Sequence, residues 1–274
     1  QSGWNVSILA PTSGEQVTRT SSLVKEILVR PSANTCASAA HLSRVEGVLA
    51  VNDDLAEAGG KLLDGQADKP ALIHCHDWYA YRAAKALSQR FSIPLVGTAH
   101  STSEPIVRWW GQLPDAEVVR QEKALYCNAD SLITVSHSMG QIIKAAHSLP
   151  ADRISIVHNG FNVAPFMNPS AKGEAIAKMR RTIVANDEKL IIFAGRLTPQ
   201  KGISALFASA SRVSKDMPRA KYLIAGEADS LESAKMMKSL TDGYPDLRGC
   251  MKLLGRLSRK QLALLYQVAD VAVV

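Results

Sequence analysis

Cysteine is scarce in this sequence, and its spacing suggests no cross-linked framework. The four cysteines, Cys36, Cys75, Cys127 and Cys250, are widely separated and form no CxxC pair. That spacing argues against a zinc site or a set of disulfide bonds, and it favours a reducing compartment. We therefore expect a cytoplasmic protein.

Long apolar runs and basic runs are lacking as well. No stretch approaches about 18 uninterrupted apolar residues, so no membrane span is expected. The opening residues, QSGWNVSILAP, lack the basic and apolar layout of a signal peptide. The net charge is +7, but no lysine- and arginine-rich run supports nucleic-acid binding. This charge fits either an anionic partner or a solvated basic surface.

What the sequence does contain is a regular alternation of short apolar runs and longer helical patterns. The apolar runs are rich in Val, Ile and Leu without clean polar alternation, which is typical of parallel strands buried on both faces. They occur at 4–11, 71–77, 93–100, 131–137, 154–160, 189–195, 221–226, 251–255 and 271–274. Helical patterns such as 79–91 and 114–127 separate them. This order predicts an α/β protein with doubly wound parallel sheets.

The length and one irregular segment indicate two domains. A chain of 274 residues is comfortable for two cores. Residues 161–175, FNVAPFMNPSAKGEA, contain two prolines, two asparagines and a glycine, which favour irregular chain. We predict Rossmann-like domains at 1–165 and 166–274.

The stretch GRLTPQKG, residues 195–202, follows an apolar strand. Gly195 ends the strand at its carboxyl edge, where open α/β sheets bind ligands. Thr198 is suited to cap a helix that begins at Pro199, and free amides at a helix start favour an anion. Arg196 and Lys201 could then grip a diphosphate. The competing interpretation is an ordinary strand–turn–helix with two surface cations.

The stretch HCHDW, residues 74–78, ends another predicted strand. His74 and His76 share one face of it, but without a third ligand a metal site is not favoured. Asp77 suits a hydrogen-bond acceptor for a hydroxylated ligand, with Trp78 as an apolar wall. Alternatively, Asp77 caps the next helix.

Three further strand ends carry polar groups. They are GTAHST (97–102), VSHSM (135–139) and HNGF (158–161). His100, in the first of them, could donate to a sugar hydroxyl, although a structural histidine is the alternative. Because the carboxyl ends of parallel strands meet at one edge, these groups predict a lined cleft.

The order of these motifs, with AKYLIAGE and MKLLGRLSRKQLALLYQVADVAVV after them, resembles the retaining glycosyltransferases of family GT4. The resemblance covers about 70–274 and implies the GT-B architecture, two Rossmann-like domains facing a cleft. It also implies sugar transfer from a nucleotide sugar, most commonly a UDP-sugar, to a glycan, lipid-linked or small-molecule acceptor, as in polysaccharide synthesis. No cofactor or metal ion is implied, and peripheral membrane contact stays open.

The resemblance also assigns residues. Arg196 and Lys201, with Gly195, match the group that holds the donor diphosphate, and His100 matches the histidine beside the transferred sugar. His76 and Asp77 match the acceptor side. Gly255, Arg256 and Leu257 match the loop beside the nucleobase. The implied catalytic residues are therefore His100, Arg196 and Lys201, with no established protein nucleophile.

The sequence departs from the family pattern at both ends. It opens at what resembles the family's second strand, and the Glu-x7-Glu element expected after the last strand is not present. We therefore expect a chain truncated at both ends. Two alternatives stay open: a sugar-nucleotide epimerase of the same architecture and a non-catalytic nucleotide-sugar-binding module.

Overall fold

The computed structural model describes residues 5–12, 17–20, 24–29, 44–103, 114–164, 166 and 173–273. The chain divides into an amino-terminal unit, Gln1–Gly160, and a carboxyl-terminal unit, Phe161–Val274. The predicted boundary after residue 165 falls on a residue outside the described ones.

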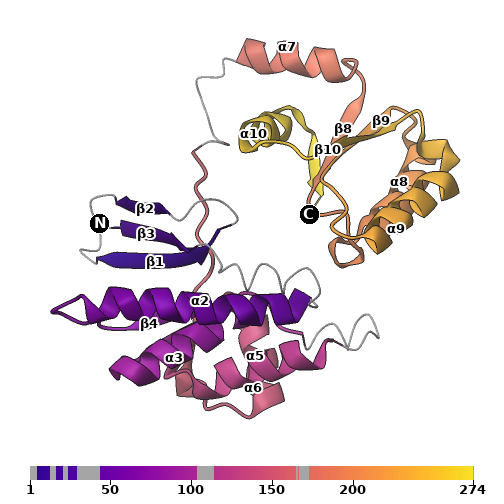
Figure 1. Cartoon of the computed structure of the whole chain (residues 1–274). Helices are drawn as coiled ribbons and strands as arrows, with labels where there is room; N and C mark the ends of the chain where they lie inside the picture. Colours follow the sequence, from indigo (N-terminus) through magenta and orange to yellow (C-terminus); the bar gives the residue numbers. More distant parts are fainter. Residues whose placement is uncertain are drawn as a thin grey trace. The chain divides into compact units, whose positions relative to one another are not determined.

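The amino-terminal unit contains two sheets (Figure 1). The larger one consists of four parallel strands in the order β4-β5-β6-β7: β4 Ile73–His76, β5 Leu95–Ala99, β6 Ser131–Thr134 and β7 Ile154–Ile156. Its helices are α2 Arg44–Asp64, α3 Tyr81–Phe91, α5 Ala116–Asn128 and α6 His137–His147, with the 3-10 turns η1 Trp78–Ala80 and η2 Ala151–Arg153. All four strands lie within apolar runs predicted from the sequence.

The smaller sheet was predicted only in part. It has the order β1-β3-β2, with β1 Val6–Pro11 parallel to β3 Val24–Val29 and β2 Val17–Thr20 antiparallel to β3. The prediction that 4–11 forms a strand buried on both faces is wrong. Leu9 packs toward α2, whereas Val6 and Ile8 on the opposite face remain 45% and 43% exposed. Among the described residues no helix covers that face, since α2 covers only the other one.

Helices α2 and α3 run together beneath the smaller sheet in Figure 1. Gly59 of α2 lies against α3, and a Cβ there would stand 2.5 Å from Leu87 Cδ1. Asn52 joins the same pair: its side-chain amide donates to the Val48 and Tyr79 carbonyls, and its oxygen accepts from the Ala83 amide. A glycine and a satisfied polar side chain thus allow and fix a close approach of the two helices.

The carboxyl-terminal unit has one sheet of four parallel strands in the order β10-β9-β8-β11. Its elements, in chain order, are α7 Gly173–Ile183, β8 Lys189–Ala194, η3 Pro199–Lys201, α8 Ile203–Asp216, β9 Ala220–Ala225, α9 Leu231–Gly243, η4 Pro245–Leu247, β10 Met251–Gly255, α10 Arg259–Val268 and β11 Val271–Val273. The two four-stranded parallel sheets with intervening helices confirm the predicted α/β class.

Two cores lie on opposite faces of this last sheet. Phe193 and Ile224 pack with Phe207 on the α8 and α9 side. Leu190 and Leu223, which point the other way, pack on the α7 and α10 side. Figure 1 shows α8 and α9 together on one side of the strands and α10 on the other. Burial on both faces explains why β8 and β9 read as continuous apolar runs.

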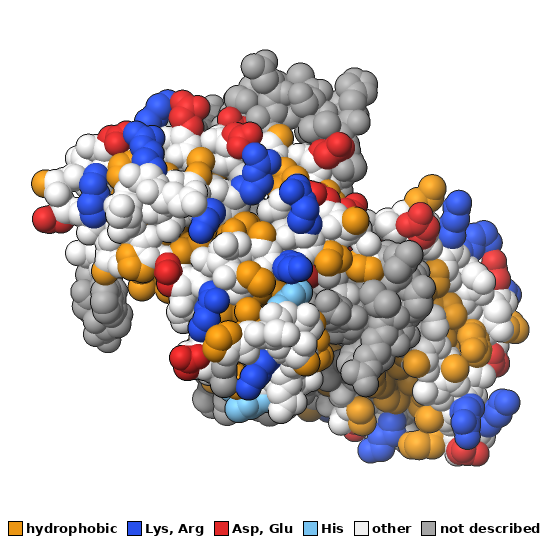
Figure 2. All heavy atoms as spheres, turned by 90° about the horizontal axis from the view of Figure 1, so that it is seen from below, with side chains coloured by type: hydrophobic (Ala, Val, Ile, Leu, Met, Phe, Trp, Pro, Cys, Tyr) orange, Lys and Arg blue, Asp and Glu red, His pale blue; other side chains and the backbone are white. Residues whose placement is uncertain are grey.

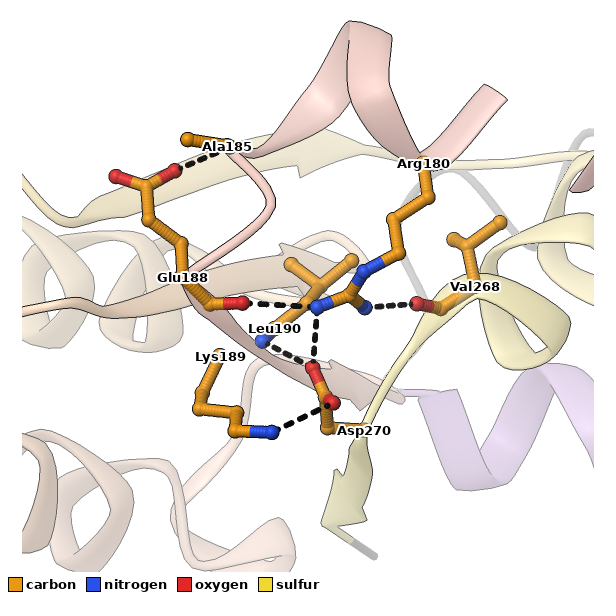
Figure 3. A network of polar contacts seen from close by, with 7 residues as sticks. All are labelled: Arg180, Ala185, Glu188, Lys189, Leu190, Val268 and Asp270. Atoms are coloured by element: carbon orange, nitrogen blue, oxygen red, sulfur yellow. Dashed lines mark hydrogen bonds and ion pairs between the residues drawn. The ribbon is translucent and has the colours of Figure 1, made fainter. Parts of the chain in front are cut away.

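Arg180 of α7 is the centre of a polar network at the amino end of β8 (Figure 3). Its guanidinium donates to the Val268 carbonyl at 2.5 Å, to the Glu188 carbonyl at 2.8 Å and to Asp270 Oδ2 at 2.7 Å. Asp270 also accepts from the Leu190 amide at 2.8 Å. The network ties α7, β8 and the end of α10 together at the edge opposite to the predicted ligand site.

The surface charge is mixed on the face shown in Figure 2, where basic and acidic side chains are interspersed. No single basic patch dominates that face, although the net charge is +7. This distribution agrees with a solvated basic surface there.

Candidate functional site

The carboxyl ends of β4 and β5 bring together the residues that the sequence singled out in the amino-terminal unit. The two strands pair in parallel, with His76 opposite Thr98. Asp77 follows β4 and His100 follows β5 directly. Residues some 24 positions apart in sequence therefore meet at one edge of the sheet.

Three histidine rings line up at this edge. His76 Nδ1 lies 2.9 Å from His100 Nε2, and the His74 and His76 rings stack with centroids 4.5 Å apart. His74 Nε2 also lies 2.7 Å from Thr98 Oγ1. In the His76–His100 contact one nitrogen donates and the other accepts, so at least one ring is neutral. The structure confirms that His74 and His76 share a face.

Burial and the neighbouring rings favour the neutral forms of His74 and His76. Burial lowers the pKa of His74, and the neighbouring His76 and His100 lower it further. Burial also lowers the pKa of His76, again helped by His100, whereas Asp77 acts in the opposite sense. No group of three or more potential metal ligands occurs among the described residues. We conclude that His74 and His76 are neutral hydrogen-bonding rings near pH 7.

Asp77 holds the backbone after β5. Its Oδ1 accepts from the His100 amide at 2.7 Å and from the Ser101 amide at 3.3 Å. Its own backbone has φ 53° and ψ −175°, a region that costs a non-glycine residue about 1–3 kcal/mol. The side chain makes no cap hydrogen bond to η1, so the helix-cap interpretation is wrong. Trp78, expected as an apolar wall, is buried.

Glu122 of α5 holds the backbone a few residues further on, at Ser103. Sequence reasoning missed this role. Its Oε2 accepts from Ser103 Oγ at 2.6 Å and from the Ser103 amide at 3.0 Å, and it lies 3.5 Å from Thr102 Oγ1. The residue is only 6% exposed, and burial raises the pKa of its carboxyl. Nothing in the sequence distinguishes it from a solvated helix glutamate.

The strand ends VSHSM and HNGF have local structural roles. Ser136 caps α6 by accepting from the Met139 amide at 3.2 Å. His158 Nδ1 lies 3.0 Å from the Val135 carbonyl oxygen, and its ring lies 6.0 Å from that of His137. A cavity of about 230 Å³ elsewhere in this unit is lined by α2 and α3, and none of the predicted site residues lines it.

In the carboxyl-terminal unit three adjacent strands end in glycine. Gly195 follows β8, Gly226 follows β9, and Gly255 ends β10. The Gly195 amide donates to the Ala225 carbonyl at 3.0 Å, and the Gly226 amide donates to the Gly255 carbonyl at 2.8 Å. Gly226 has φ 148°, and a Cβ there would stand 1.8 Å from the Gly195 carbonyl oxygen. Gly226 is a second residue that the sequence reasoning missed, although it follows an apolar strand just as Gly195 does.

The GRLTPQKG segment forms a turn and not a single helix start. Thr198 precedes the 3-10 turn η3, Gly202 has φ 69°, and α8 begins at Ile203. The predicted hydroxyl cap is absent, because the Lys201 amide donates to the Thr198 carbonyl and not to its hydroxyl. Thr198 Oγ1 is buried without a hydrogen-bond partner among the described residues. The first amides of α8 nevertheless open toward the loop, as in any helix start.

The two cations of this segment differ in their surroundings. Arg196 Nη1 lies 2.9 Å from Asp229 Oδ2, and Asp229 Oδ1 accepts from Ser233 Oγ at 3.1 Å. The Arg196 side chain is still 57% exposed. Lys201 is exposed and forms no ion pair within the described part of the chain. Asp229, the partner of Arg196, was not anticipated from the sequence.

The loop Gly255–Leu257 joins β10 to α10. Gly255 has φ 67°, Arg256 is exposed, and Leu257 packs on the core between the sheet and α7 and α10. Ser258 then caps α10 in a reciprocal box with Gln261. Of the three residues, Arg256 has its side chain available to a ligand.

Comparisons with known proteins add a family context. Residues 1–164 match a family model described as Glycosyltransferase Family 4, and residues 175–274 match one described as Glycosyl transferases group 1. An uncharacterised glycosyltransferase of Methanocaldococcus jannaschii is 32% identical over 212 residues, 76% of this chain and 52% of the relative. A glycogen synthase of Mycobacterium tuberculosis is 29% identical over 219 residues, 78% of this chain and 48% of the relative. The chain thus spans about half the length of these curated relatives.

Solved structures show the same fold. Sucrose-phosphate synthase from Thermosynechococcus elongatus superposes with a TM-score of 0.76 at 21% identity, covering 98% of this chain and 65% of that one. Anabaena HepE in complex with UDP-glucose superposes with a TM-score of 0.65 at 17% identity, covering 90% of this chain and 59% of that one.

None of the helices in the described ranges combines the length and apolar character needed to cross a membrane.

Proposed function

Because the chain belongs to glycosyltransferase family 4, we propose that it moves a sugar from a nucleoside-diphosphate sugar to a hydroxyl acceptor, with the anomeric configuration kept. We propose a UDP-sugar as donor, the ligand class with which HepE was solved. The acceptor is a glycan, a lipid-linked sugar or a small molecule, and the reaction takes place in the cytoplasm. The whole protein's activity is part of this proposal.

The observation that carries the proposal is the loop between β8 and α8. Arg196 and Lys201 lie at its two ends, exposed, beside the carboxyl edge of the sheet and the first amides of α8. A departing nucleoside diphosphate gains negative charge on its phosphate oxygens. Fixed cations and helix amides stabilise that charge more in the transition state than in the ground state. Because these side chains supply positive charge, we expect no metal ion or other cofactor to be needed.

The two cations should contribute unequally to binding. Lys201 has its charge available, and its loss should weaken binding by about 1.5–3 kcal/mol, the worth of a charge-assisted hydrogen bond. Arg196 must give up at least part of its contact with Asp229, which as an exposed ion pair is worth about 0–1 kcal/mol. We therefore expect Lys201→Ala to cost more affinity than Arg196→Ala.

Calorimetry of UDP and uridine tests the proposal. Lys201→Ala should lower UDP affinity about tenfold or more while uridine binding hardly changes. Lys215→Ala is the matched control, because it removes one exposed positive charge from the last turn of α8. If Lys201→Ala lowered the affinities for UDP and uridine equally, Lys201 would not belong to a diphosphate site. The proposed function would then lose its main physical support. UDP binding without sugar transfer would favour a non-catalytic binding module.

A further inference from the structure

Burying the Glu122 carboxylate costs free energy, and an apolar side chain could fill the same place without that cost. The residue is 6% exposed on a helix whose other buried side chains include Leu125 and Tyr126, which belong to the core. Removing a carboxylate from water costs several kcal/mol unless hydrogen bonds compensate, and apolar replacements of buried charges are often at least as stable. Among the residues that the structure describes, the hydroxyl and amide groups that donate to Glu122 all belong to Thr102 and Ser103. The Glu122 carboxylate therefore holds one short segment through hydrogen bonds.

That segment, His100–Ser103, has no regular secondary structure, and side chains from distant elements hold it along its whole length. Asp77 accepts from the amides of His100 and Ser101 at the start. Tyr126 Oη donates to the Ser101 carbonyl at 3.3 Å. Glu122 accepts from Thr102 and Ser103 at the end. The only ring in the segment, that of His100, is left to contact His76.

We propose that Glu122 is a positioning residue for sugar transfer: it fixes Thr102 and Ser103 so that the His100 ring stays beside His76 at the carboxyl edge of the sheet. This rests on the proposed function, in which His100 lies beside the transferred sugar. Glu122 acts through the segment and does not touch the substrate. Asp77 and Tyr126 hold the first half of the segment and Glu122 the second, so the loss of Glu122 leaves Thr102 and Ser103 without the side chain that holds them among the described residues.

Three variants separate positioning from packing. Glu122→Ala removes the acceptor altogether. Glu122→Gln keeps a carbonyl oxygen that can accept from both Ser103 donors, so it should restore most of the turnover. Ser103→Ala keeps the backbone donor and removes the hydroxyl, so its effect should be intermediate. Glu117→Ala is the control on the same helix, since Glu117 contacts only Arg120, Gln121 and the first-turn cap among the described residues.

The kinetic test uses the whole chain with UDP-glucose as donor and release of UDP as the signal. We expect Glu122→Ala to lower kcat at least tenfold while the calorimetric Kd for UDP changes less than twofold, because the proposed UDP site belongs to the other unit. Unchanged kcat for Glu122→Ala overturns the proposal, as does Glu122→Gln failing as badly as Ala. If Glu122→Ala does not fold, the Gln and Ser103→Ala variants decide by the same criteria.

A second readout needs no activity. The ring ¹H–¹⁵N resonances of His100 and His76 should shift in Glu122→Ala and in Ser103→Ala, whereas those of His158, which lies against Val135, should not. If the His100 and His76 resonances shift in these variants but the wild-type chain transfers no glucose, the proposed function with this donor is refuted and the positioning stands. If the His100 and His76 resonances do not shift in a folded Glu122→Ala variant, the proposed positioning role of Glu122 is overturned.

Discussion

Replacement of Gly226 by alanine should disrupt the loop that carries Arg196. A Cβ at Gly226 would lie 1.8 Å from the Gly195 carbonyl oxygen and 2.9 Å from its carbonyl carbon. Both are backbone atoms, so no side-chain rotation can relieve the contact. The two strands β8 and β9 would have to separate where they end, or the Gly195 peptide would have to turn away.

The size of the effect follows from that geometry. To bring the contact from 1.8 Å to 3.0 Å, the shortest that real Cβ atoms show, the Gly195 carbonyl must withdraw by about 1.2 Å. Overpacking of this kind costs about 1–3 kcal/mol, and the φ of 148° adds a further cost for any residue with a Cβ. We expect Gly226→Ala to lower the unfolding free energy by about 3–5 kcal/mol. Displacement of Gly195 also moves Arg196, so UDP affinity should fall as well.

Urea unfolding and UDP calorimetry measure the two effects separately. Gly249→Ala is the control, because a Cβ there meets nothing within 4 Å and Gly249 is not a residue with positive φ. It should leave both quantities close to those of the wild type. A Gly226→Ala protein that unfolds within about 1 kcal/mol of the wild type, outside the range expected for overpacking, would refute the close approach of the two glycines.

Two other perturbations test the scaffold. Arg180→Ala leaves the Val268 and Glu188 carbonyls and Asp270 without their shared donor, so unfolding free energy should fall by about 2–3 kcal/mol, whereas the exposed Arg181→Ala should change it little; equal urea midpoints for the two variants would count against the network. Because folding lowers the pKa of His74, its neutral form is favoured, and the stability it contributes is present above its ordinary pKa of about 6.5 and lost as pH falls through the lowered value. The difference in unfolding free energy between wild type and His74→Gln should therefore shrink from pH 8 to pH 5, and parallel urea curves would contradict this.

The buried strands were predictable because strands buried on both faces have unbroken apolar sequences. Runs such as KLIIFA and AKYLIA have cores on both faces and show it as unbroken apolar sequence. The strand β2, VTRT, is exposed at all four residues and carries no such pattern. Helix α2 contains Gly47, Gly59 and Gly60, which weaken a helical pattern. A Cβ at Gly59 would stand 2.5 Å from Leu87 Cδ1, a close approach of the two helices that only the packing reveals.

The sequence predicted where the candidate site residues lie, but it did not predict which side chains hold them in place. That His76, Asp77 and His100 share an edge follows from the parallel order of their strands. That Asp77 binds the His100 amide, and that Glu122 binds Ser103, depends on contacts across 19–24 residues. A buried glutamate in a helix has the same sequence signature as an exposed one. The direct roles of Arg196, Lys201 and His100 in binding and transfer stay predictions for the experiments above.

The two units hold their site loops by opposite means, and the difference bears on what each loop can do. In the carboxyl-terminal unit backbone hydrogen bonds at Gly195, Gly226 and Gly255 hold the strand ends together, and the Lys201 side chain takes no part in them. Lys201 is thereby left to meet an anion. In the amino-terminal unit the carboxylates of Asp77 and Glu122 accept from backbone amides and a hydroxyl, and the His100 ring lies against His76 at the edge. A loop with an available cation suits the diphosphate of the proposed donor, and a loop that presents a histidine nitrogen suits a sugar hydroxyl, in agreement with the roles proposed for Lys201 and His100.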